Sequence, residues 1–276
     1  MDYKKYSGAG NTFLMINNLE SLIEVNGDLV TDLISIKGNE NLDGVIFVES
    51  SSIADYKMNY YNKDGTGNAL CGNGLRCTAK FIRDENFCNN DIILIEGVGK
   101  IYDCRFTVDG EISVGFPPPN KMKFKFKLKV HFQEWWQLIN ASYVDVGSPH
   151  VIVFIDDIEK PKINSLSEIP IDDWGRNLRM HKDFMPDGAN AHFVRVVDAD
   201  KGELEIRSFE RGVEGETLAC GTGSLSSAIA AYALKNVKTP IKLHTKSGQI
   251  LSVDFNVVQN KIIDLKLKGK AEKIKN

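Results

Sequence analysis

A cysteine followed by a glycine, one polar residue and a second glycine occurs twice in this chain, once in each half. The first copy is Cys71-Gly72-Asn73-Gly74 and the second is Cys220-Gly221-Thr222-Gly223. An apolar periodic segment follows each copy at once, which predicts an α-helix beginning within the motif. The first N–H groups of a helix have no partner within it, and the helix dipole is positive there. Each motif therefore predicts a thiol at a helix N-terminus, where its pKa is lowered and an anion binds beside it.

The segments that precede the two motifs also follow one order of turns and strands. The matched places are Gly10-Asn11 with Gly147-Ser148, Gly44 with Asn190, and Tyr61-Asn62-Lys63 with Phe209-Glu210-Arg211. Self-similarity of this kind indicates a duplicated structural unit. We therefore predict an α/β fold of two similar domains related by a pseudo-twofold axis, each presenting its cysteine-bearing helix start to the other.

Consecutive prolines at 117–119 mark the junction between the domains, because proline interrupts both helices and strands. We expect an N-terminal domain of residues 1–116, completed by residues 264–276, and a C-terminal domain of residues 120–263. Apolar spacing predicts a helix within 18–37, whereas the charged residues 268–276 predict a solvated tail. Strands are predicted for 10–16, 44–49, 58–61, 92–96, 101–108, 111–114, 121–130, 151–155, 191–197 and 204–209, and within 241–267.

Composition excludes several classes of protein. The formal net charge of −3 gives no reason to expect a nucleic acid partner, and no apolar run approaches the ~20 residues of a membrane span. The scattered cysteines suit neither a disulfide framework nor a zinc site, so we expect no metal and expect Cys77, Cys88 and Cys104 to be packing residues. The N-terminal residues 1–5 lead into no signal sequence, which predicts a cytoplasmic protein without a membrane partner.

Two thiols on opposite sides of one substrate carbon can invert its configuration. A thiolate on one face removes the α-proton of an amino acid, and a thiol on the other face returns a proton. Helix-start N–H groups stabilise the intermediate by binding the carboxylate that takes up its negative charge. Such an enzyme needs no pyridoxal cofactor, and no lysine motif that would anchor one is present.

With these features, the chain resembles the diaminopimelate epimerase family over almost its whole length. The motifs that carry the resemblance are Gly8-Ala9-Gly10-Asn11-Thr12-Phe13, Tyr61-Asn62-Lys63-Asp64-Gly65, Cys71-Gly72-Asn73-Gly74-Leu75-Arg76-Cys77, Gly147-Ser148-Pro149-His150, Glu210-Arg211-Gly212 and Leu218-Ala219-Cys220-Gly221-Thr222-Gly223. The resemblance implies two domains, each a curved β-sheet around a central helix, with the active site in the cleft between them. It also implies a cofactor-independent isomerase that interconverts LL- and meso-diaminopimelate for lysine and peptidoglycan synthesis.

The resemblance further implies roles for individual residues. Cys71 and Cys220 would be the acid–base pair, with His150 and Glu210 beside the thiols. The residues expected to hold the distal end of the substrate are Asn11, Asn62, Asn190 and Arg211. Those expected to present N–H groups to the reacting carboxylate are Gly72, Asn73, Gly221 and Thr222.

Three positions depart from the pattern of the family. Ser148 stands where the family usually has asparagine, so its contact with the substrate is expected to be shorter or water-mediated. Gly44 replaces an amide side chain found in some members, and Thr12 replaces the usual aspartate after Asn11. These departures bear on the identity of the substrate more than on the reaction.

Other functions remain open on the sequence alone. One is a two-thiol racemase of proline or hydroxyproline, a second is a cysteine hydrolase pairing one thiol with His150, and a third is an amino-acid-binding protein without turnover. Glu210 and Arg211 favour a substrate with a second charged end, because a guanidinium binds a carboxylate through two parallel hydrogen bonds. The partner expected is a small-molecule substrate, and the sequence does not decide whether the chain forms a homodimer.

Overall fold

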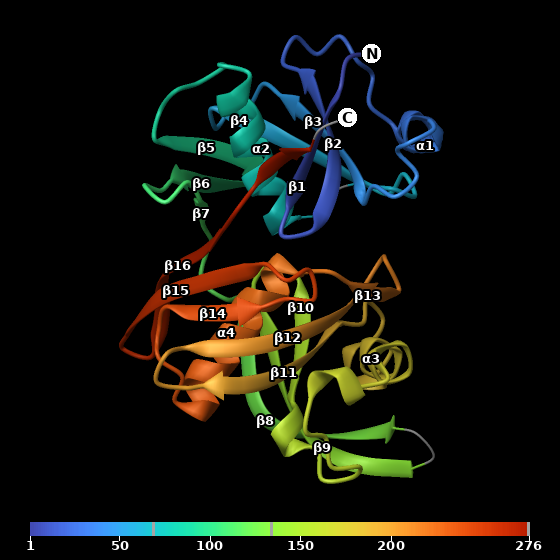
Figure 1. Ribbon diagram of the computed structural model, residues 1–276, viewed down its shortest axis with the longest axis vertical. Helices are drawn as coiled ribbons and strands as arrows, with labels where there is room; N and C mark the ends of the chain where they lie inside the picture. The colour runs from blue at the N-terminus through green and yellow to red at the C-terminus, as the bar shows by residue number, and fades with distance from the viewer. Residues whose placement is uncertain (68–69, 133–134, 275–276) are drawn as a thin grey trace. The chain divides into compact units, whose positions relative to one another are not determined.

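The structure, a computed structural model, describes residues 1–67, 70–132 and 135–274. Its chain forms two compact units, coloured along the sequence in Figure 1. The first unit is Met1–Phe116 with Lys268–Asn276, and the second is Pro117–Leu267. Within the described ranges, no helix combines the length and the apolar character needed to cross a membrane.

The first unit is a mixed sheet that surrounds the helix α2 (Gly72–Asp84), which contacts every strand of the unit. Across the sheet the strands follow the order β17, β1, β2, β3, β4, β5, β6 and β7; the β2–β3 and β4–β5 neighbours run parallel and the others antiparallel. Their bounds are β1 Lys4–Gly8, β2 Asn11–Asn18, β3 Gly44–Glu49, β4 Tyr56–Asn62, β5 Ile92–Gly97, β6 Lys100–Phe106, β7 Ile112–Gly115 and β17 Glu272–Ile274.

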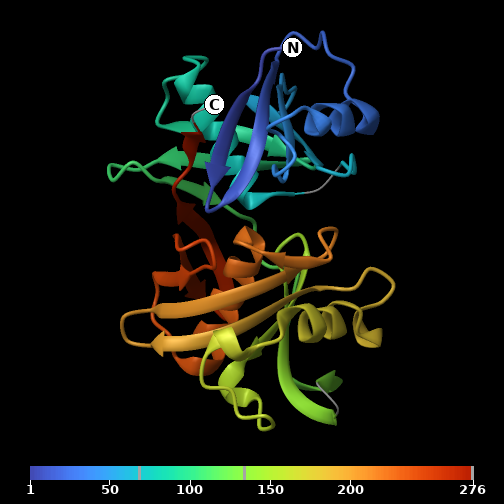
Figure 2. The same cartoon turned by 45° about the vertical axis from the view of Figure 1, so that its right-hand side comes forward.

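The helix α1 (Gly27–Ser35) packs on β3, where Figures 1 and 2 show it beside the sheet. It is shorter than the helix expected within 18–37. Asn26 begins it by accepting a hydrogen bond from the N–H of Leu29 at 2.9 Å, which satisfies one of the unpaired donors at a helix start. Val30 and Leu33 then bury its apolar face against β2 and β3.

The second unit repeats this order of strands. Here β8, β9, β10, β11, β12, β14 and β15 are neighbours in turn; β10–β11 and β12–β14 run parallel and the others antiparallel. The helix α4 (Gly221–Lys235) contacts β9, β10, β11, β14 and β15, so the predicted repetition of a sheet on a cysteine-bearing helix is confirmed. The bounds are β8 Lys121–Phe132, β9 Trp135–Asp145, β10 Pro149–Phe154, β11 Asn190–Asp198, β12 Glu203–Glu210, β13 Gly215–Thr217, β14 Ile241–His244, β15 Ile250–Val258 and β16 Lys261–Gly269.

A helix that the sequence analysis did not identify, α3 (Ile171–Arg179), covers the other face of β11. Side chains alternate between the faces of a strand, so Phe193 lies against Trp174 of α3 while His192 lies against Gly223 of α4. Trp174 is fully buried and stacks on Phe132, with 4.2 Å between the ring centroids. Short 3₁₀ helices lie nearby at Ile155–Asp157, Leu166–Glu168 and Lys182–Phe184.

Two charged segments behave differently from one another. In β8 the lysines alternate with buried Leu128 and Val130, which confirms the predicted half-buried strand. The C-terminal segment, in contrast, is not a solvated tail, and that prediction is wrong. β17 pairs antiparallel with β1, because a charged strand still satisfies its backbone groups at a sheet edge while its lysines face water; residues 275 and 276 lie outside the described residues.

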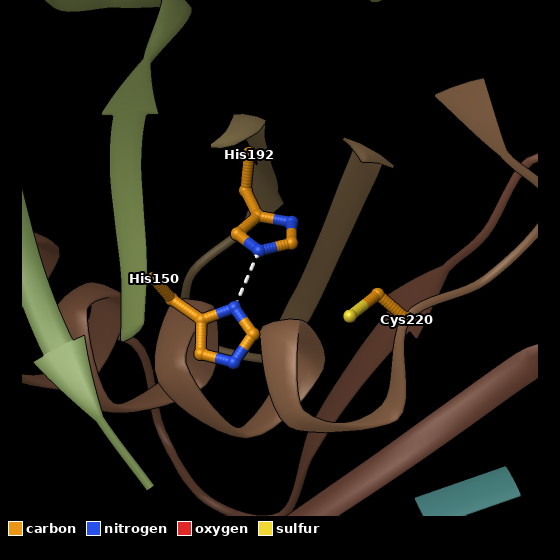
Figure 3. Close-up of side chains that lie close together, drawn as sticks. All are labelled: His150, His192 and Cys220. Carbon is orange, nitrogen blue, oxygen red and sulfur yellow. Dashed lines mark hydrogen bonds between the residues drawn. The ribbon is translucent and has the colours of Figure 1, made fainter. Parts of the chain in front are cut away.

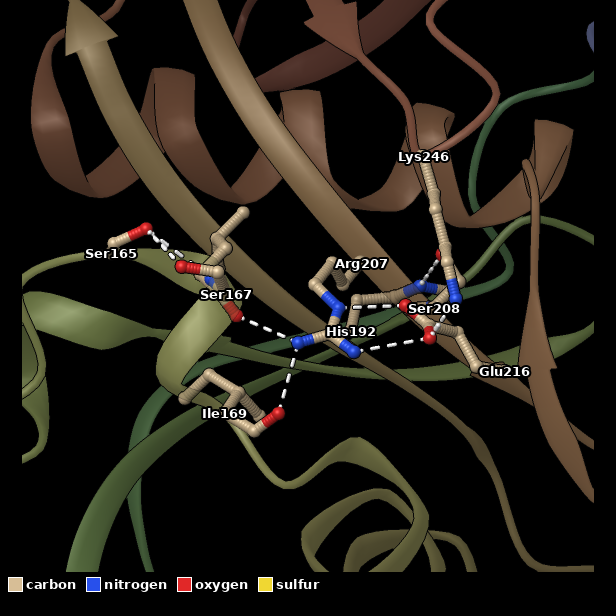
Figure 4. Close-up of polar contacts among 9 residues, drawn as sticks. Ser165, Ser167, Ile169, His192, Arg207, Ser208, Glu216 and Lys246 are labelled. Atoms are coloured by element: carbon tan, nitrogen blue, oxygen red, sulfur yellow. Dashed lines mark hydrogen bonds and ion pairs between the residues drawn. The ribbon is translucent and has the colours of Figure 1, made fainter.

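A largely buried ion pair, Arg207 with Glu216, holds the segment that leads to α4 (Figure 4). Arg207 of β12 donates to both carboxylate oxygens of Glu216 in β13, at 2.6 and 3.0 Å. Its remaining nitrogen donates to the carbonyls of Leu166 and Ile169 at 2.7 and 2.9 Å, and Lys246 also pairs with Glu216. The side chains of Arg207 and Glu216 are 18% and 9% exposed, so water replaces few of these contacts.

Arg207→Met is therefore expected to lower the free energy of unfolding by about 2–3 kcal/mol, because it leaves buried acceptors without a donor. Arg195→Met is the matched control, since Arg195 also binds a glutamate, Glu205, through two hydrogen bonds of 2.8 and 2.7 Å. That pair is about one-third exposed, so its loss is expected to be below about 1 kcal/mol. Urea unfolding measures both, and equal losses would contradict the prediction.

Candidate functional site

The two cysteines cap their helices in the same way. Cys71 is the N-cap of α2 and Cys220 is the N-cap of α4. Each sulfur accepts a hydrogen bond from the backbone N–H of the second glycine of its motif, at 3.2 Å from Gly74 and 3.3 Å from Gly223. The predicted position of both thiols at helix N-termini is therefore confirmed.

The surroundings of Cys220 raise the pKa of its thiol well above the ordinary value. Burial is the largest cause, and the negative charge of Glu210 adds to it. Hydrogen bonds from Gly223 and Thr222 act in the opposite direction but are outweighed. The expected lowering of the thiol pKa is thus wrong for Cys220, which is protonated at neutral pH because desolvation exceeds the effect of the helix start.

A fully buried cation, Arg76, lies one turn into α2. It donates to the side-chain oxygen of Asn73 at 2.6 Å, and Asn73 donates in turn to the side-chain oxygen of Asn11 at 2.5 Å. Burial lowers the pKa of Arg76, and a thiolate at the nearby Cys71 would oppose that shift. Arg76 therefore orients two predicted substrate-binding side chains, a role that its spacing of three residues from Asn73 on a helix could have indicated.

In the second unit, the predicted site residues lie around two buried histidines, His150 and His192. Nδ1 of His150 shares a hydrogen bond of 2.8 Å with Nε2 of His192, and Nδ1 of His192 shares one of 2.9 Å with the hydroxyl of Ser208 (Figure 3 draws the two rings and Cys220). Both histidines are 0% exposed, and burial lowers the pKa of each, so both rings are neutral. His192 and Ser208 were not recognised in the sequence, because only the pairing of β10, β11 and β12 brings them to His150.

These histidines and Cys220 can each offer one ligand atom within 4.8 Å of the others, a spacing that suits a metal ion. The directions of the donor atoms do not suit one. The two nearest ring nitrogens face each other along their shared hydrogen bond rather than a common point, as Figure 3 shows. The rings are thus satisfied by one another and by Ser208.

Two hydroxyl groups link the helix start that bears Cys220 to these histidines. Ser148 shares a hydrogen bond of 2.8 Å with Nε2 of His150 and donates to the hydroxyl of Thr222 at 3.3 Å. The hydroxyl of Thr222 lies 3.8 Å from the sulfur of Cys220. The structure thus brings together four of the predicted site residues of this unit.

Three more predicted residues of the second unit lie around the turn after β12: Asn190 at the start of β11, Glu210 at the end of β12 and Arg211 in the turn itself. Asn190 donates to the carbonyl of Pro149 at 3.1 Å and accepts from the backbone N–H of Arg211 at 2.8 Å, so it fixes the start of that turn. Glu210 accepts a hydrogen bond from Thr217. The side chain of Arg211 is exposed, which leaves a guanidinium accessible to an anion.

In the first unit, Asn62 accepts from the hydroxyl of Tyr60 at 2.7 Å and donates to Thr66 at 2.9 Å. Two departures from the family pattern have structural causes here. A side chain at Gly44 would place its Cβ 2.2 Å from the carbonyl oxygen of Tyr61, so glycine is required. Thr12 donates both its N–H, at 2.7 Å, and its side-chain hydroxyl, at 3.3 Å, to the carboxylate of Asp43, and an aspartate at this place would have no hydroxyl to donate.

Known proteins match this chain over both of its halves. A sequence profile described as diaminopimelate epimerase matches residues 3–120 and 142–274. The chain is 33% identical over 266 residues to the diaminopimelate epimerase of Chlorobaculum tepidum, covering 93% of each chain. It is 32% identical over 268 residues to that of Aquifex aeolicus, covering 93% of this chain and 90% of the relative.

Solved structures share the fold at much lower identity. A PhzF-family phenazine biosynthesis protein of Bacillus anthracis superposes with a TM-score of 0.69 at 16% identity, covering 99% of this chain and 96% of the other. A hydroxyproline epimerase from Agrobacterium vitis gives 0.69 at 11% identity, covering 99% and 90%. These likenesses confirm the predicted α/β fold class.

Proposed function

The chain belongs to the diaminopimelate epimerase family, and from this membership we infer that it is an isomerase that interconverts LL- and meso-diaminopimelate in lysine biosynthesis. The observation that carries the inference is the family match across both halves, including both cysteine motifs. Racemases of proline or hydroxyproline are not favoured, since the solved structures of that kind share only the fold with this chain, at 13% and 11% identity. A cysteine hydrolase uses one thiol, so that function does not account for the second cysteine at a helix start.

The two thiols have different electrostatic neighbours, which suits different starting roles. Cys220, beside Glu210, is protonated and suits the proton donor. Cys71 lies near the Arg76 cation, and a nearby positive charge favours a thiolate. Cys71 would thus remove the α-proton on one face and Cys220 would return one on the other, and the reverse reaction exchanges these roles.

The developing negative charge is expected to settle on the reacting carboxylate. The backbone N–H groups at the two helix starts, from Gly72, Asn73, Gly221 and Thr222, are suited to bind it. Arg211, with Asn11, Asn62, Asn190 and Ser148, would hold the distal amino-acid end. A bidentate guanidinium–carboxylate pair there would reject amino acids that lack a second carboxylate. A cytoplasmic location suits the supply of a biosynthetic precursor.

Proton exchange in D2O tests the proposal directly. Wild-type protein incubated with LL-diaminopimelate is expected to give the meso isomer carrying one deuterium at the inverted centre, seen by proton NMR. Proline and lysine, incubated in parallel, should keep their α-protons, because they cannot pair with Arg211 through a distal carboxylate. Exchange of proline without exchange of diaminopimelate would contradict the proposed substrate, and inversion with full retention of the original hydrogen would contradict exchange at the thiols.

A further inference from the structure

A continuous line of hydrogen-bonding groups runs through the second unit from Ser208 to Cys220. Between neighbouring polar atoms the distances are 2.9 Å from Ser208 to His192, 2.8 Å from His192 to His150, 2.8 Å from His150 to Ser148, 3.3 Å from Ser148 to Thr222 and 3.8 Å from Thr222 to the sulfur. Ser208, His192 and His150 are all buried, so no bulk water competes for these contacts. Buried polar groups strengthen one another when every member is paired.

In the first unit, the side chains equivalent to His150 and His192 are Phe13 and Ile46, which carry no polar atom and so cannot form such a line. His150 is paired with Asn190 across β10 and β11, as Phe13 is paired with Gly44 across β2 and β3. Two residues further along, His192 lies opposite Ser208 while Ile46 lies opposite Tyr60. The duplicated fold is therefore stable with apolar side chains at the two central positions, Phe13 and Ile46, and does not require histidines there.

The protons along this line can be assigned a direction. Ser148 has one hydroxyl proton and donates it to Thr222, so it accepts from Nε2–H of His150. The ring of His150 is neutral, which leaves its Nδ1 as the acceptor from Nε2–H of His192. Nδ1 of His192 then accepts from the hydroxyl of Ser208. Each donor from Ser208 to Ser148 points toward Cys220, and the hydroxyl of Thr222 lies 3.8 Å from the sulfur, where it can donate to a thiolate.

The hydrogen-bonded groups from Ser208 to Thr222 affect one step of the reaction, the transfer of a proton from Cys220 to the α-carbon. When Cys220 protonates the α-carbon of the substrate, its S–H bond breaks, the proton forms the new C–H bond, and the electron pair stays on the sulfur. The resulting thiolate is buried beside Glu210 and gains from a donor directed at it. We propose that His192, anchored by Ser208, is a positioning residue that fixes the tautomer of His150 and thereby directs the donors of Ser148 and Thr222 at the Cys220 thiolate.

This inference rests on the proposed epimerase function, and three substitutions of His192 test it. The amide of His192→Gln reaches the place of Nε2 and can still donate to His150, whereas that of His192→Asn reaches only the place of Nδ1. His192→Phe keeps a ring beside Gly223 but has no polar atom. We expect kcat to fall about 10- to 100-fold in the Asn and Phe variants with KM nearly unchanged, and to recover to within about fivefold of wild type in the Gln variant.

A purely structural role predicts a different ranking, in which the Phe variant is the most active because it preserves the ring. That ranking, or equal activity in all three variants, would overturn the inference. Ser208→Ala keeps every ring in place and removes only the anchor. It is expected to lower kcat about two- to fivefold, and an unchanged kcat would also count against the proposal.

Alkylation by iodoacetamide, followed by mass spectrometry, provides a readout that needs no turnover. The thiolate is the species that reacts, so the rate at Cys220 should fall in the Asn and Phe variants, while the rate at Cys71 in the same sample stays constant. A wild-type protein that alkylates as expected but does not epimerise diaminopimelate would contradict the proposed function alone. Unchanged alkylation of Cys220 in an active enzyme would contradict only the positioning role.

Discussion

Cys220→Ala is expected to abolish the epimerisation of diaminopimelate, with a fall in kcat of at least about 10²–10⁴-fold, because one of the two proton transfers loses its acid–base group. Cys71→Ala is expected to do the same. The folded state should change little, since the substitution removes a single side-chain atom at a helix start and Cys71 is partly exposed. Chiral chromatography of the LL and meso isomers measures the loss of epimerisation.

The two single variants are expected to differ in what they retain. With Cys220 removed, a Cys71 thiolate can still exchange the α-proton of the isomer whose hydrogen faces it, but no group delivers a proton to the opposite face. Cys220 alone should exchange the other isomer. In D2O, each variant is therefore expected to label one stereoisomer without inverting it, and the two variants should label opposite isomers.

Cys88→Ala is the matched control for these variants. Cys88 is half-buried and stands at no helix start, so its removal is expected to leave epimerisation unchanged. Cys77 and Cys104 are unsuitable controls because they are fully buried, as predicted for packing residues, and their loss leaves a cavity. If either catalytic variant labels both isomers, or still inverts one, a single thiol performs both proton transfers and the two-base mechanism fails.

The parts of the fold that the sequence predicted are those with local causes. Each Cys-Gly-x-Gly motif determines a helix start through its own backbone donors, and β-branched runs such as Gly44–Glu49 form strands wherever they pair. The helix α3 does carry a local signal that the prediction missed: acidic residues in its first turn, basic residues in its last turn, and Ile171, Trp174 and Leu178 on one buried face. What periodicity does not reveal is its partner, since Trp174 packs on Phe132 and Phe193 of distant strands.

The site was predicted least well where contacts join distant strands. His192 was overlooked because its partners, His150 and Ser208, become neighbours only through the register of β10, β11 and β12. The lowered pKa expected for Cys220 failed for a related reason. A helix start is a local feature, whereas burial and the charge of Glu210 depend on how the whole unit packs. Non-local burial outweighed the local effect.

Substitution of the second glycine of each motif, Gly74 or Gly223, is expected to change stability by different amounts, because the two glycines have different neighbours. A Cβ added at Gly223 would lie 2.2 Å from Cε1 and 2.6 Å from Nε2 of His192. That ring cannot move aside without breaking its hydrogen bonds to His150 and Ser208. Gly223→Ala is therefore expected to lower the free energy of unfolding by about 1–3 kcal/mol, as overpacking does elsewhere, and to reduce kcat by displacing the helix start that bears the thiol.

Gly74→Ala is the control that the duplication provides. There the added Cβ would meet the end of the Ile46 side chain at 3.1 Å, Cβ of Cys71 at 3.2 Å and the sulfur of Met58 at 3.3 Å, distances that a shift of a few tenths of an ångström relieves. The gain in helix propensity, up to about 1 kcal/mol, offsets these contacts, so little net change in stability is expected. Urea unfolding compares the two variants, and equal destabilisation would mean that the His192 ring is not the obstacle.

A double-mutant cycle tests whether the His192 ring is what the added methyl group at position 223 contacts. If His192 is what Gly223→Ala collides with, then adding His192→Ala should recover stability relative to the sum of the two single losses, giving a coupling of about 1 kcal/mol or more. The same cycle with Ile46→Ala and Gly74→Ala should show a much smaller coupling. Additive losses at Gly223 and His192 would contradict direct contact. A coupling in which the double variant is more stable than the sum of the two single losses predicts would show why Gly223 is a glycine. Only a residue without a side chain lets the start of α4 pack directly against the hydrogen-bonded ring of His192.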